Sequence, residues 1–214
     1  MTENSDVRYP DLTGQVALVT GGSGGIGAAT CRLLAANGVR IAVNGRDRPA
    51  IDAVVADIRA GGGIAEPAAG DVTDEQTVRD VRDRVERTLG LPGMVERESG
   101  SIITMSSAAG RQPGGANAAY AAAKAGVVMF TRHLAREVAA HHVRVNCLAP
   151  SAVLNDRMRR VMTAEQITGL AAGFPLGRIG RPLDVARATA FLASDASSWM
   201  TGVTLDLAGG RVIM

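Results

Sequence analysis

The stretch that decides the fold is QVALVTGGSGGIGAATCRLLAANG, residues 15–38. It begins with a short apolar run at 15–20, which is typical of a buried strand in a parallel sheet. Glycines follow at 20–27, and helical periodicity then continues to Gly38, a common type of helix stop. A strand, a glycine turn and a helix in this order predict the first βα unit of an α/β fold.

Strands and helices continue to alternate along the rest of the chain. Further strands are expected at residues 39–45, 64–72, 101–107, 143–150 and 202–210. Further helices are expected at residues 49–63, 74–90, 118–140, 156–172 and 182–194. The helix at 118–140 has little polar surface before Arg132, so we expect much of it to be buried. This order predicts an α/β fold with a doubly wound parallel sheet, in a single domain that covers residues 1–214 after a loose lead-in at 1–13.

The composition is that of an ordinary soluble globular protein, since 46% of the 214 residues are hydrophobic and 21% are charged. The net charge is +2 and no basic run is interleaved with aromatic residues, so neither a nucleic-acid nor a membrane partner is expected. No apolar run approaches the roughly 20 residues of a transmembrane helix, and the polar N-terminus does not resemble a signal peptide. We interpret Cys31 and Cys147 as reduced core thiols, which favours a cytoplasmic protein.

The glycine-rich turn TGGSGGIG at 20–27 is typical of a dinucleotide-binding site. Its glycines allow a pyrophosphate to approach the backbone, and the N-terminus of the next helix offers N–H groups and a positive dipole end. A nucleotide-binding P-loop is excluded because no Gly-Lys-Ser/Thr sequence follows. The alternative interpretation is a turn that only lets the helix and the strand pack closely.

The type of cofactor is expected to depend on the end of the second strand. A carboxylate there would bind the ribose 2′-hydroxyl of NAD(H), but this chain has Arg46, whose guanidinium suits the 2′-phosphate of NADP(H). We therefore favour NADP(H) over NAD(H). The competing acid, Asp47, is expected to cap the next helix. Asp71 and Val72 would flank the adenine, and a structural turn residue is the alternative interpretation of Asp71.

Lys124 is the only lysine of a chain that otherwise uses arginine, and it follows Tyr120 by four residues. At this spacing the two side chains share one face of a helix. An ammonium beside a phenol favours the phenolate, which would let Tyr120 exchange a proton near neutral pH. Ser107, at the end of an expected strand, could hold a carbonyl oxygen. Simple surface packing is the alternative for a tyrosine and a lysine one turn apart.

With these residues, the chain resembles a classical short-chain dehydrogenase/reductase and is similar to the 3-oxoacyl-acyl-carrier-protein reductase branch of that family. Five segments carry the resemblance: TGGSGGIG (20–27), DVTD (71–74), ITMSSAAG (103–110), YAAAK (120–124) and the C-terminal stretch 175–210. The resemblance implies an oxidoreductase that transfers a hydride reversibly between a nicotinamide cofactor and a carbonyl or alcohol. Together with the argument from Arg46, this predicts an NADP(H)-dependent enzyme that acts on a small or acyl carbonyl substrate. The resemblance also implies a homo-oligomer.

The resemblance further implies roles for individual residues. Tyr120 would be the general acid/base, Ser107 would orient and polarise the carbonyl, and Lys124 would bind the nicotinamide ribose and stabilise the Tyr120 phenolate. Val153 would place its backbone against the nicotinamide carboxamide, and Asn155 stands where the family often has a threonine. The expected cofactor-binding residues are Gly21, Ser23, Gly25, Ile26, Gly27, Arg46, Asp71, Val72, Tyr120, Lys124, Pro150, Val153 and Asn155.

One part of the family's pattern has no counterpart in this chain. A further strand and helix should lie before the strand at 101–107, but residues 91–100 are too few, because a βαβ unit needs about 30 or more residues. The family's Asn-Asn-Ala-Gly segment is missing, and so is the helix that carries its fourth catalytic residue, an asparagine. The strands at 15–20 and 101–107 would then either pair with each other or leave their edges unpaired.

Two explanations of this gap stay open at the level of the sequence. Either the chain is a true deletion form, with a compromised sheet and little activity, or the molecule contains residues that this sequence omits. The first explanation gives an alternative function, a cofactor-binding or structural protein of the same family without turnover. No metal site is expected, because His141 and His142 at a helix end suit the helix dipole and have no further ligands in view.

Overall fold

The computed structural model describes residues 8–89 and 93–212, and of Asp156 and Arg157 it describes only the backbone. The chain divides into two compact units. Unit 1 takes in the described residues up to Gly93 together with Ser194–Ala196, and unit 2 takes in Met94–Ala193 and the described residues from Ser197 onward. The expected lead-in at 1–13 lies partly outside the described residues, and its last part contains a 3-10 helix, η1 (Pro10–Leu12).

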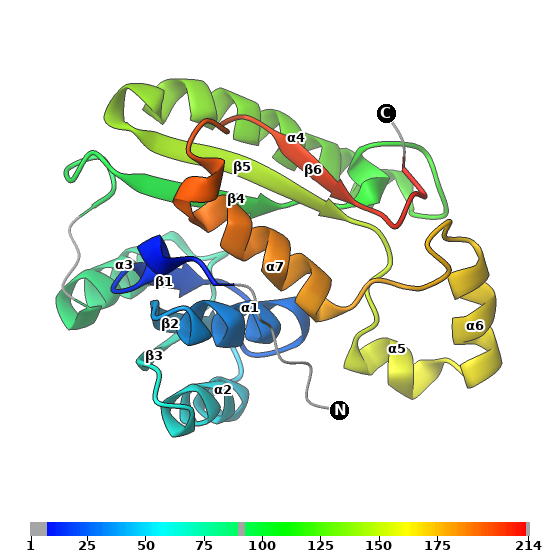
Figure 1. Ribbon diagram of the computed structural model, residues 1–214, viewed down its shortest axis with the longest axis horizontal. Coiled ribbons are helices and arrows are strands. Elements are labelled where there is room, and N and C mark those ends of the chain that lie inside the picture. The colour runs from blue at the N-terminus through cyan, green and yellow to red at the C-terminus, as the bar shows by residue number, and fades with distance from the viewer. Residues whose placement is uncertain (1–7, 90–92, 213–214) are drawn as a thin grey trace. The chain divides into compact units, whose positions relative to one another are not determined.

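Unit 1 is a three-stranded parallel sheet with helices on both faces (Figure 1). Its strands are β1 (Val16–Val19), β2 (Arg40–Gly45) and β3 (Ala65–Ala69), hydrogen-bonded in the order β1-β2-β3. Its helices are α1 (Gly25–Ala36), α2 (Arg48–Ala60) and α3 (Glu75–Leu89). Helices α1 and α2 contact each other and the sheet, while α3 contacts β3.

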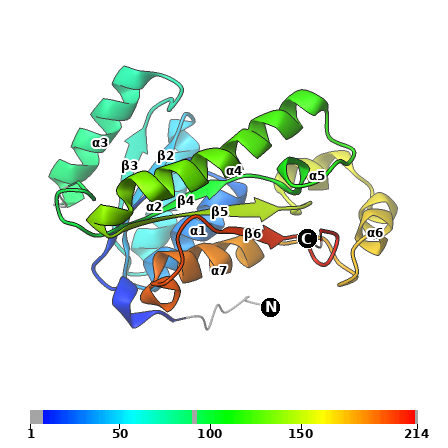
Figure 2. The ribbon, with the colours of Figure 1, turned by 90° about the horizontal axis from the view of Figure 1, so that it is seen from above.

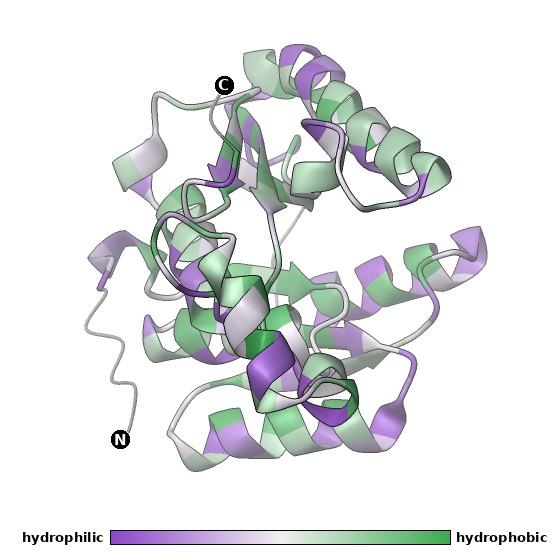
Figure 3. Ribbon diagram, turned by 90° about the vertical axis from the view of Figure 1, so that its right-hand side faces the viewer, coloured by the Kyte–Doolittle hydropathy of each residue, from purple (hydrophilic) through white to green (hydrophobic). Residues whose placement is uncertain are grey.

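The core of unit 1 follows from the alternation of side chains along β2 and β3. On one face, Ala42 and Ala68 pack with Val81 and Leu89 of α3. The small alanines let this helix approach the sheet closely. The side chains of β2 that alternate with Ala42 are also fully buried, on the face covered by α1 and α2. Figure 3 shows the helices alternating between hydrophilic and hydrophobic residues, as helices that cover a buried sheet should.

Unit 2 is built on a second three-stranded parallel sheet. Its strands are β4 (Gly100–Met105), β5 (Val143–Pro150) and β6 (Thr204–Leu207), in the order β4-β5-β6. Its helices are α4 (Ala118–Val138), α5 (Asp156–Val161), α6 (Ala164–Ala172) and α7 (Pro182–Ala193). Helices α4 and α7 lie on opposite faces of this sheet (Figure 1, Figure 2), which buries most of β5. Short 3-10 helices are η2 (Ala108–Gly110), η3 (Ala139–His141) and η4 (Asp195–Ser197).

Each strand and helix expected from the sequence is confirmed in the described residues, with ends shifted by a few positions at most. The helical stretch at 156–172 is divided into α5 and α6. The division has a local cause, since the Thr163 hydroxyl accepts a hydrogen bond from the Gln166 N–H while the Gln166 side chain accepts one from the Thr163 N–H. This reciprocal capping box starts a new helix.

The prediction that much of helix α4 is buried is wrong. Only Val128, Thr131 and Ala135 of this helix are buried, and Phe130 is 59% exposed. The reason is that α4 lies along one face of its sheet and contacts β5 and η2 there, whereas the rest of its surface faces outward. Apolar sequence alone could not distinguish the covered face from the uncovered one.

The strands that would flank the missing βα unit are both end strands. In unit 1, β1 is bonded to β2, and in unit 2, β4 is bonded to β5. Whether these two strands pair with each other or leave their edges unpaired stays a prediction. Leu18 of β1 is 42% exposed, which is unusual for a strand in the middle of a parallel sheet.

Within residues 8–89 and 93–212, no helix combines the length and the hydropathy needed to cross a membrane.

The buried side chain of Asn44 gives a test of the unit 1 fold. Its Nδ2 donates to the carbonyl oxygens of Ala68 at 2.7 Å and Gly70 at 3.2 Å, and so it fastens β2 to the end of β3. Asn44→Ala removes both hydrogen bonds of a fully buried side chain, so we expect the free energy of unfolding to fall by about 2 kcal/mol in urea titrations. The control Asp52→Ala removes an exposed ion pair with Arg48 and should change it by less than about 0.5 kcal/mol. Equal effects of the two substitutions would contradict this role.

Candidate active site

The glycine turn between β1 and α1 is folded tightly onto the start of the helix. Gly21 has φ +64°, a left-handed conformation that favours glycine. A Cβ at Gly27 would overlap the carbonyl oxygen of Gly21 and lie 2.7 Å from its carbonyl carbon. The Gly22 N–H donates to the Asn44 carbonyl oxygen at 2.8 Å, which ties the turn to the end of β2. The turn therefore places backbone atoms, which no side chain covers, at the N-terminus of α1.

The N-terminus of α1 can accept an anion. Gly24 is the N-cap residue and no side-chain hydrogen bond caps this helix in the described part of the chain. The N–H groups of the first turn, from Gly25 to Gly27, are thus left for another acceptor. The helix dipole adds a partial positive charge at the same point. Ser23 lies beside the end of β2, since a Cβ at Gly45 would be 2.9 Å from its Oγ.

Arg46 and Asp71 come together at the ends of β2 and β3. Nη1 of Arg46 lies 3.8 Å from Oδ2 of Asp71, and both side chains are well exposed. Hydrogen bonds from the N–H and the hydroxyl of Thr73 hold the pKa of Asp71 below its usual value, with a smaller contribution from Arg46. These hydrogen bonds agree with the alternative interpretation of Asp71 as a structural turn residue. Contact of the adenine with Asp71 and with the exposed Val72 stays a prediction.

Asp47 does what was expected of it. Its Oδ1 accepts a hydrogen bond from the Ala50 N–H at 3.2 Å and caps α2. The acid that could have competed for a ribose is therefore engaged in the helix start, and the guanidinium of Arg46, directly after β2, is exposed.

Tyr120 and Lys124 lie on one face of α4, near its N-terminus. The helix starts where Oδ1 of Asn117 accepts a hydrogen bond from the Tyr120 N–H at 2.8 Å. Nζ of Lys124 lies 5.8 Å from the centroid of the Tyr120 ring and donates to the Met105 carbonyl oxygen at 2.9 Å. Lys124 is half-buried, whereas Tyr120 is 44% exposed, so its phenol is open to a ligand.

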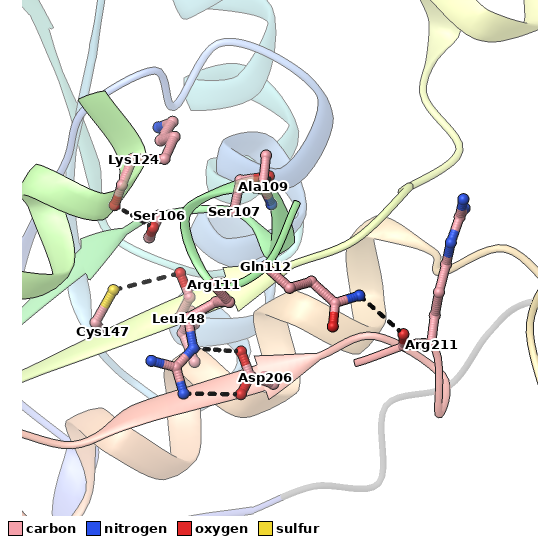
Figure 4. A network of polar contacts seen from close by, with 10 residues as sticks. All are labelled: Ser106, Ser107, Ala109, Arg111, Gln112, Lys124, Cys147, Leu148, Asp206 and Arg211. Carbon is pink, nitrogen blue, oxygen red and sulfur yellow. Dashed lines mark hydrogen bonds and ion pairs between the residues drawn. The ribbon is translucent and has the colours of Figure 1, made fainter. Parts of the chain in front are cut away.

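The two serines after β4 have different partners (Figure 4). Ser106 is buried and its Oγ donates to the Lys124 carbonyl oxygen at 2.7 Å. Ser107 is the N-cap of η2, where its Oγ accepts a hydrogen bond from the Ala109 N–H at 3.3 Å. Because Oγ of Ser107 is an acceptor in this bond, its hydroxyl proton stays available for another acceptor. Unit 2 therefore brings a serine hydroxyl, a phenol and an ammonium to one end of α4.

The remaining predicted residues of unit 2 lie at and after the end of β5. Pro150 is its last residue, and the nearly buried Val153 forms an isolated β-bridge with Gly180. Oδ1 of Asn155 accepts a hydrogen bond from the Met158 N–H at 2.9 Å and caps α5. The structure thus gives Asn155 a capping role, and its predicted cofactor contact stays a prediction.

One ion pair near the serines was missed by the sequence analysis. Arg111, which ends η2, meets Asp206 of β6 through two hydrogen bonds (Figure 4). The available signal was a carboxylate in the middle of an expected strand, since a charge there needs a partner. Nothing in the sequence identified Arg111, which is 95 positions away, as that partner.

Among the described residues, no group of three or more His, Cys, Asp or Glu side chains could hold a metal ion. His142 adopts φ +55° at the end of η3, a left-handed conformation that terminates the helix.

Two family models match the sequence and together cover most of it. The model described as short chain dehydrogenase matches residues 15–91, and the model described as Enoyl-(Acyl carrier protein) reductase matches residues 90–211. The two matches meet at 90–91, next to the segment that is too short for the family's further βα unit.

Relatives match along nearly the whole chain. The 3-oxoacyl-(acyl-carrier-protein) reductase FabG of Escherichia coli is 35% identical over 95% of this chain and 100% of its own length. The 3-oxoacyl-(acyl-carrier-protein) reductase of Synechocystis is 36% identical over 94% of this chain and 98% of its own length. The alignment with the E. coli enzyme runs over 244 positions, more than the 214 residues of this chain, so that relative has residues with no counterpart here.

Solved structures share the fold. A 3-oxoacyl-(acyl-carrier-protein) reductase from Brucella melitensis superposes with a TM-score of 0.87 at 25% identity, covering 96% of this chain and 94% of its own. A 7α-hydroxysteroid dehydrogenase in complex with NADH and 7-oxo glycochenodeoxycholic acid has a TM-score of 0.89 at 27% identity, covering 95% and 96%. These likenesses confirm the predicted doubly wound α/β fold.

The close contact in the glycine turn predicts the effect of a single methyl group. Gly27→Ala forces the Gly21 backbone away from α1, so we expect the free energy of unfolding to fall by about 2 kcal/mol, measured by urea denaturation. Gly61→Ala is the control in the same unit, because φ of Gly61 is −80° and its Cβ would meet only ordinary contacts of 3.5 Å. A Gly27→Ala protein as stable as the control would show that the turn is not packed as described.

Proposed function

Because the chain belongs to the short-chain dehydrogenase/reductase family, we propose that it reduces a carbonyl group to an alcohol, reversibly, with NADP(H) and with Tyr120 as the proton donor. The observation that carries this proposal is the arrangement at the start of α4, where Lys124 is held by the Met105 carbonyl oxygen beside the exposed phenol of Tyr120. Ser107 completes the set with a hydroxyl proton that is free to donate.

The residues present fit a nicotinamide dinucleotide. A Cβ at Gly21 would stand in open space, so the backbone of the turn is uncovered there, and the uncapped N-terminus of α1 offers N–H groups to a pyrophosphate. When bound, the cofactor supplies the hydride to the substrate carbon or accepts it from that carbon. Gly21, Ser23, Gly25, Ile26 and Gly27 would hold the phosphates. Pro150, Val153 and Asn155 would line the nicotinamide end.

The protein side of the reaction is proton transfer and charge stabilisation. Ser107 Oγ would donate a hydrogen bond to the substrate carbonyl oxygen and orient it. Tyr120 would give its phenolic proton to that oxygen in reduction, and its phenolate would take the proton back in oxidation. The Lys124 ammonium would stabilise the phenolate electrostatically and would bind the nicotinamide ribose. Arginine does not reproduce this compact charge on a flexible stem, which accounts for a lone lysine here.

The preference for NADP(H) rests on Arg46. Its guanidinium is exposed at the end of β2, where the ribose of a bound dinucleotide is expected in this fold. A planar guanidinium can bind a 2′-phosphate with two hydrogen bonds. Asp71 competes weakly for it, since their 3.8 Å separation in an exposed setting is worth little.

The substrate class is proposed from the relatives. Those of E. coli and Synechocystis are named as 3-oxoacyl-(acyl-carrier-protein) reductases, so a 3-oxoacyl thioester is the first substrate to assay. The homo-oligomer implied by the resemblance stays a prediction.

A second candidate function is supported by the missing βα unit. With β1 and β4 as end strands, the chain could bind the cofactor without turning over a substrate. NADPH binding together with no reduction of 3-oxoacyl thioesters or of a panel of ketones would favour this second function over the first.

Removal of one hydroxyl tests the proposed acid. Tyr120→Phe should lower kcat for NADPH-dependent reduction by about 1,000-fold, because general acid catalysis contributes on that scale. NADPH affinity, measured by fluorescence titration, should change by less than about threefold. Tyr9→Phe is the matched control, since Tyr9 is the only other tyrosine, and it should retain full activity. A fully active Tyr120→Phe enzyme would eliminate Tyr120 as the proton donor.

Substitution of Arg46 tests the choice of cofactor. Arg46→Ala should weaken NADPH binding about tenfold, the equivalent of about 1.4 kcal/mol, and leave NADH binding unchanged. Arg48→Ala, which removes a nearby exposed arginine paired with Asp52, is the control and should affect neither. If Arg46→Ala weakens NADPH and NADH equally, Arg46 does not recognise the 2′-phosphate.

A further inference from the structure

The ion pair between Arg111 and Asp206 lies at the far end of the segment that begins with Ser107. Nε of Arg111 is 2.9 Å from Oδ1 of Asp206, and Nη2 is 3.1 Å from Oδ2. This bidentate geometry is the strongest that a guanidinium and a carboxylate adopt. The two side chains are only 14% and 20% exposed, whereas those of the bidentate pair Arg178–Asp184 are 47% and 29% exposed.

Ser107 and Arg111 are the two ends of one short hydrogen-bonded turn. The Gly110 N–H donates to the Ser107 carbonyl oxygen at 2.9 Å, and the Arg111 N–H donates to the Ala108 carbonyl oxygen at 3.0 Å. Ser107 also caps this turn, η2, with its own Oγ. A turn of three residues transmits a displacement of one end to the other, because few bonds lie between them.

The same turn is held at two further points. The Gly110 backbone is packed against α4 so closely that a Cβ there would lie 2.7 Å from the Ala125 nitrogen. Nε2 of Gln112 donates to the Arg211 carbonyl oxygen at 3.2 Å (Figure 4). Residues 113–117, which follow, are exposed. The Arg111–Asp206 pair is therefore the charged anchor of η2 immediately before an exposed stretch of chain.

We propose that Arg111 and Asp206 are positioning residues, which fix the η2 turn to β6 and thereby hold the Ser107 hydroxyl in the orientation that binds the substrate carbonyl. Neither residue contacts the substrate. The inference rests on the proposed function, because the orientation of Ser107 matters only for an enzyme that polarises a carbonyl. Small misplacement of such a donor costs catalysis heavily, since its contribution depends on geometry.

The test is a comparison of the Arg111→Gln substitution in two backgrounds. In the otherwise unchanged chain, we expect kcat for reduction of a 3-oxoacyl thioester to fall about tenfold, with NADPH affinity changed less than twofold. In a Ser107→Ala chain, where the hydroxyl is already absent, the same substitution should lower kcat less than twofold. A residue that acts through Ser107 is non-additive with it, whereas a residue with a general structural role lowers activity by the same factor in both backgrounds.

Two further variants serve as controls for this comparison. Arg111→Gln with Asp206→Asn removes both charges, leaves no partly buried charge unpaired, and should lose about the same tenfold as the single substitution. Arg79→Gln removes the exposed pair with Glu75 on α3 and should retain full activity. Equal losses from Arg111→Gln in both backgrounds, or no loss in either, would overturn the proposal.

Hydrogen exchange separates a failure of this inference from a failure of the proposed function. Arg111→Gln should raise amide exchange in the peptide that covers 107–112 while exchange in α7 stays unchanged. If the protein without any substitution has no reductase activity, the proposed function is overturned. The role of the Arg111–Asp206 pair in catalysis is then overturned as well. Unaltered exchange at 107–112 in an active enzyme would overturn the positioning role alone.

Discussion

The hydrogen bond from Nζ of Lys124 to the carbonyl oxygen of Met105 connects helix α4 to the last residue of strand β4. A second bond, from Oγ of Ser106 to the Lys124 carbonyl oxygen, crosses the same junction in the opposite sense. Together they set the register between the element that carries Tyr120 and the element that leads to Ser107. The first bond also fixes the position of the Lys124 ammonium, whose side chain is half-buried. The roles proposed for Ser107, Tyr120 and Lys124 depend on these two hydrogen bonds.

The missing βα unit affects the sheets more than the residues at this junction. Each three-stranded sheet is parallel, has helices on both faces and ends on the strand that would have flanked the absent unit. The glycine turn depends on contacts within unit 1, and the Ser107, Tyr120 and Lys124 arrangement depends on contacts within unit 2. Each part can therefore keep its local geometry although residues present in the E. coli relative have no counterpart here.

Much of this could be predicted from the sequence, because the deciding signals are local. Apolar runs of strand length, glycines at turns and capping residues such as Asp47 determine the elements over short distances. The pairing of Tyr120 with Lys124 follows from helical spacing alone. What failed depended on neighbours distant in sequence: the exposed face of α4 around Phe130, and the pairing of Arg111 with Asp206. No periodicity encodes which face finds a partner, or which distant carboxylate an arginine will meet.

The most direct test of the account is the reaction itself, catalysed by the purified chain after its intact mass has been measured as 22.0 kDa. NADPH and a 3-oxoacyl thioester would be incubated with it, and NADPH oxidation and the hydroxyacyl product would both be quantified. The account predicts one hydroxyacyl product for each NADPH oxidised, with the reaction abolished by Tyr120→Phe. NADPH binding without product, at any substrate concentration tested, would contradict it and would identify the chain as a binding protein of this family that does not turn over.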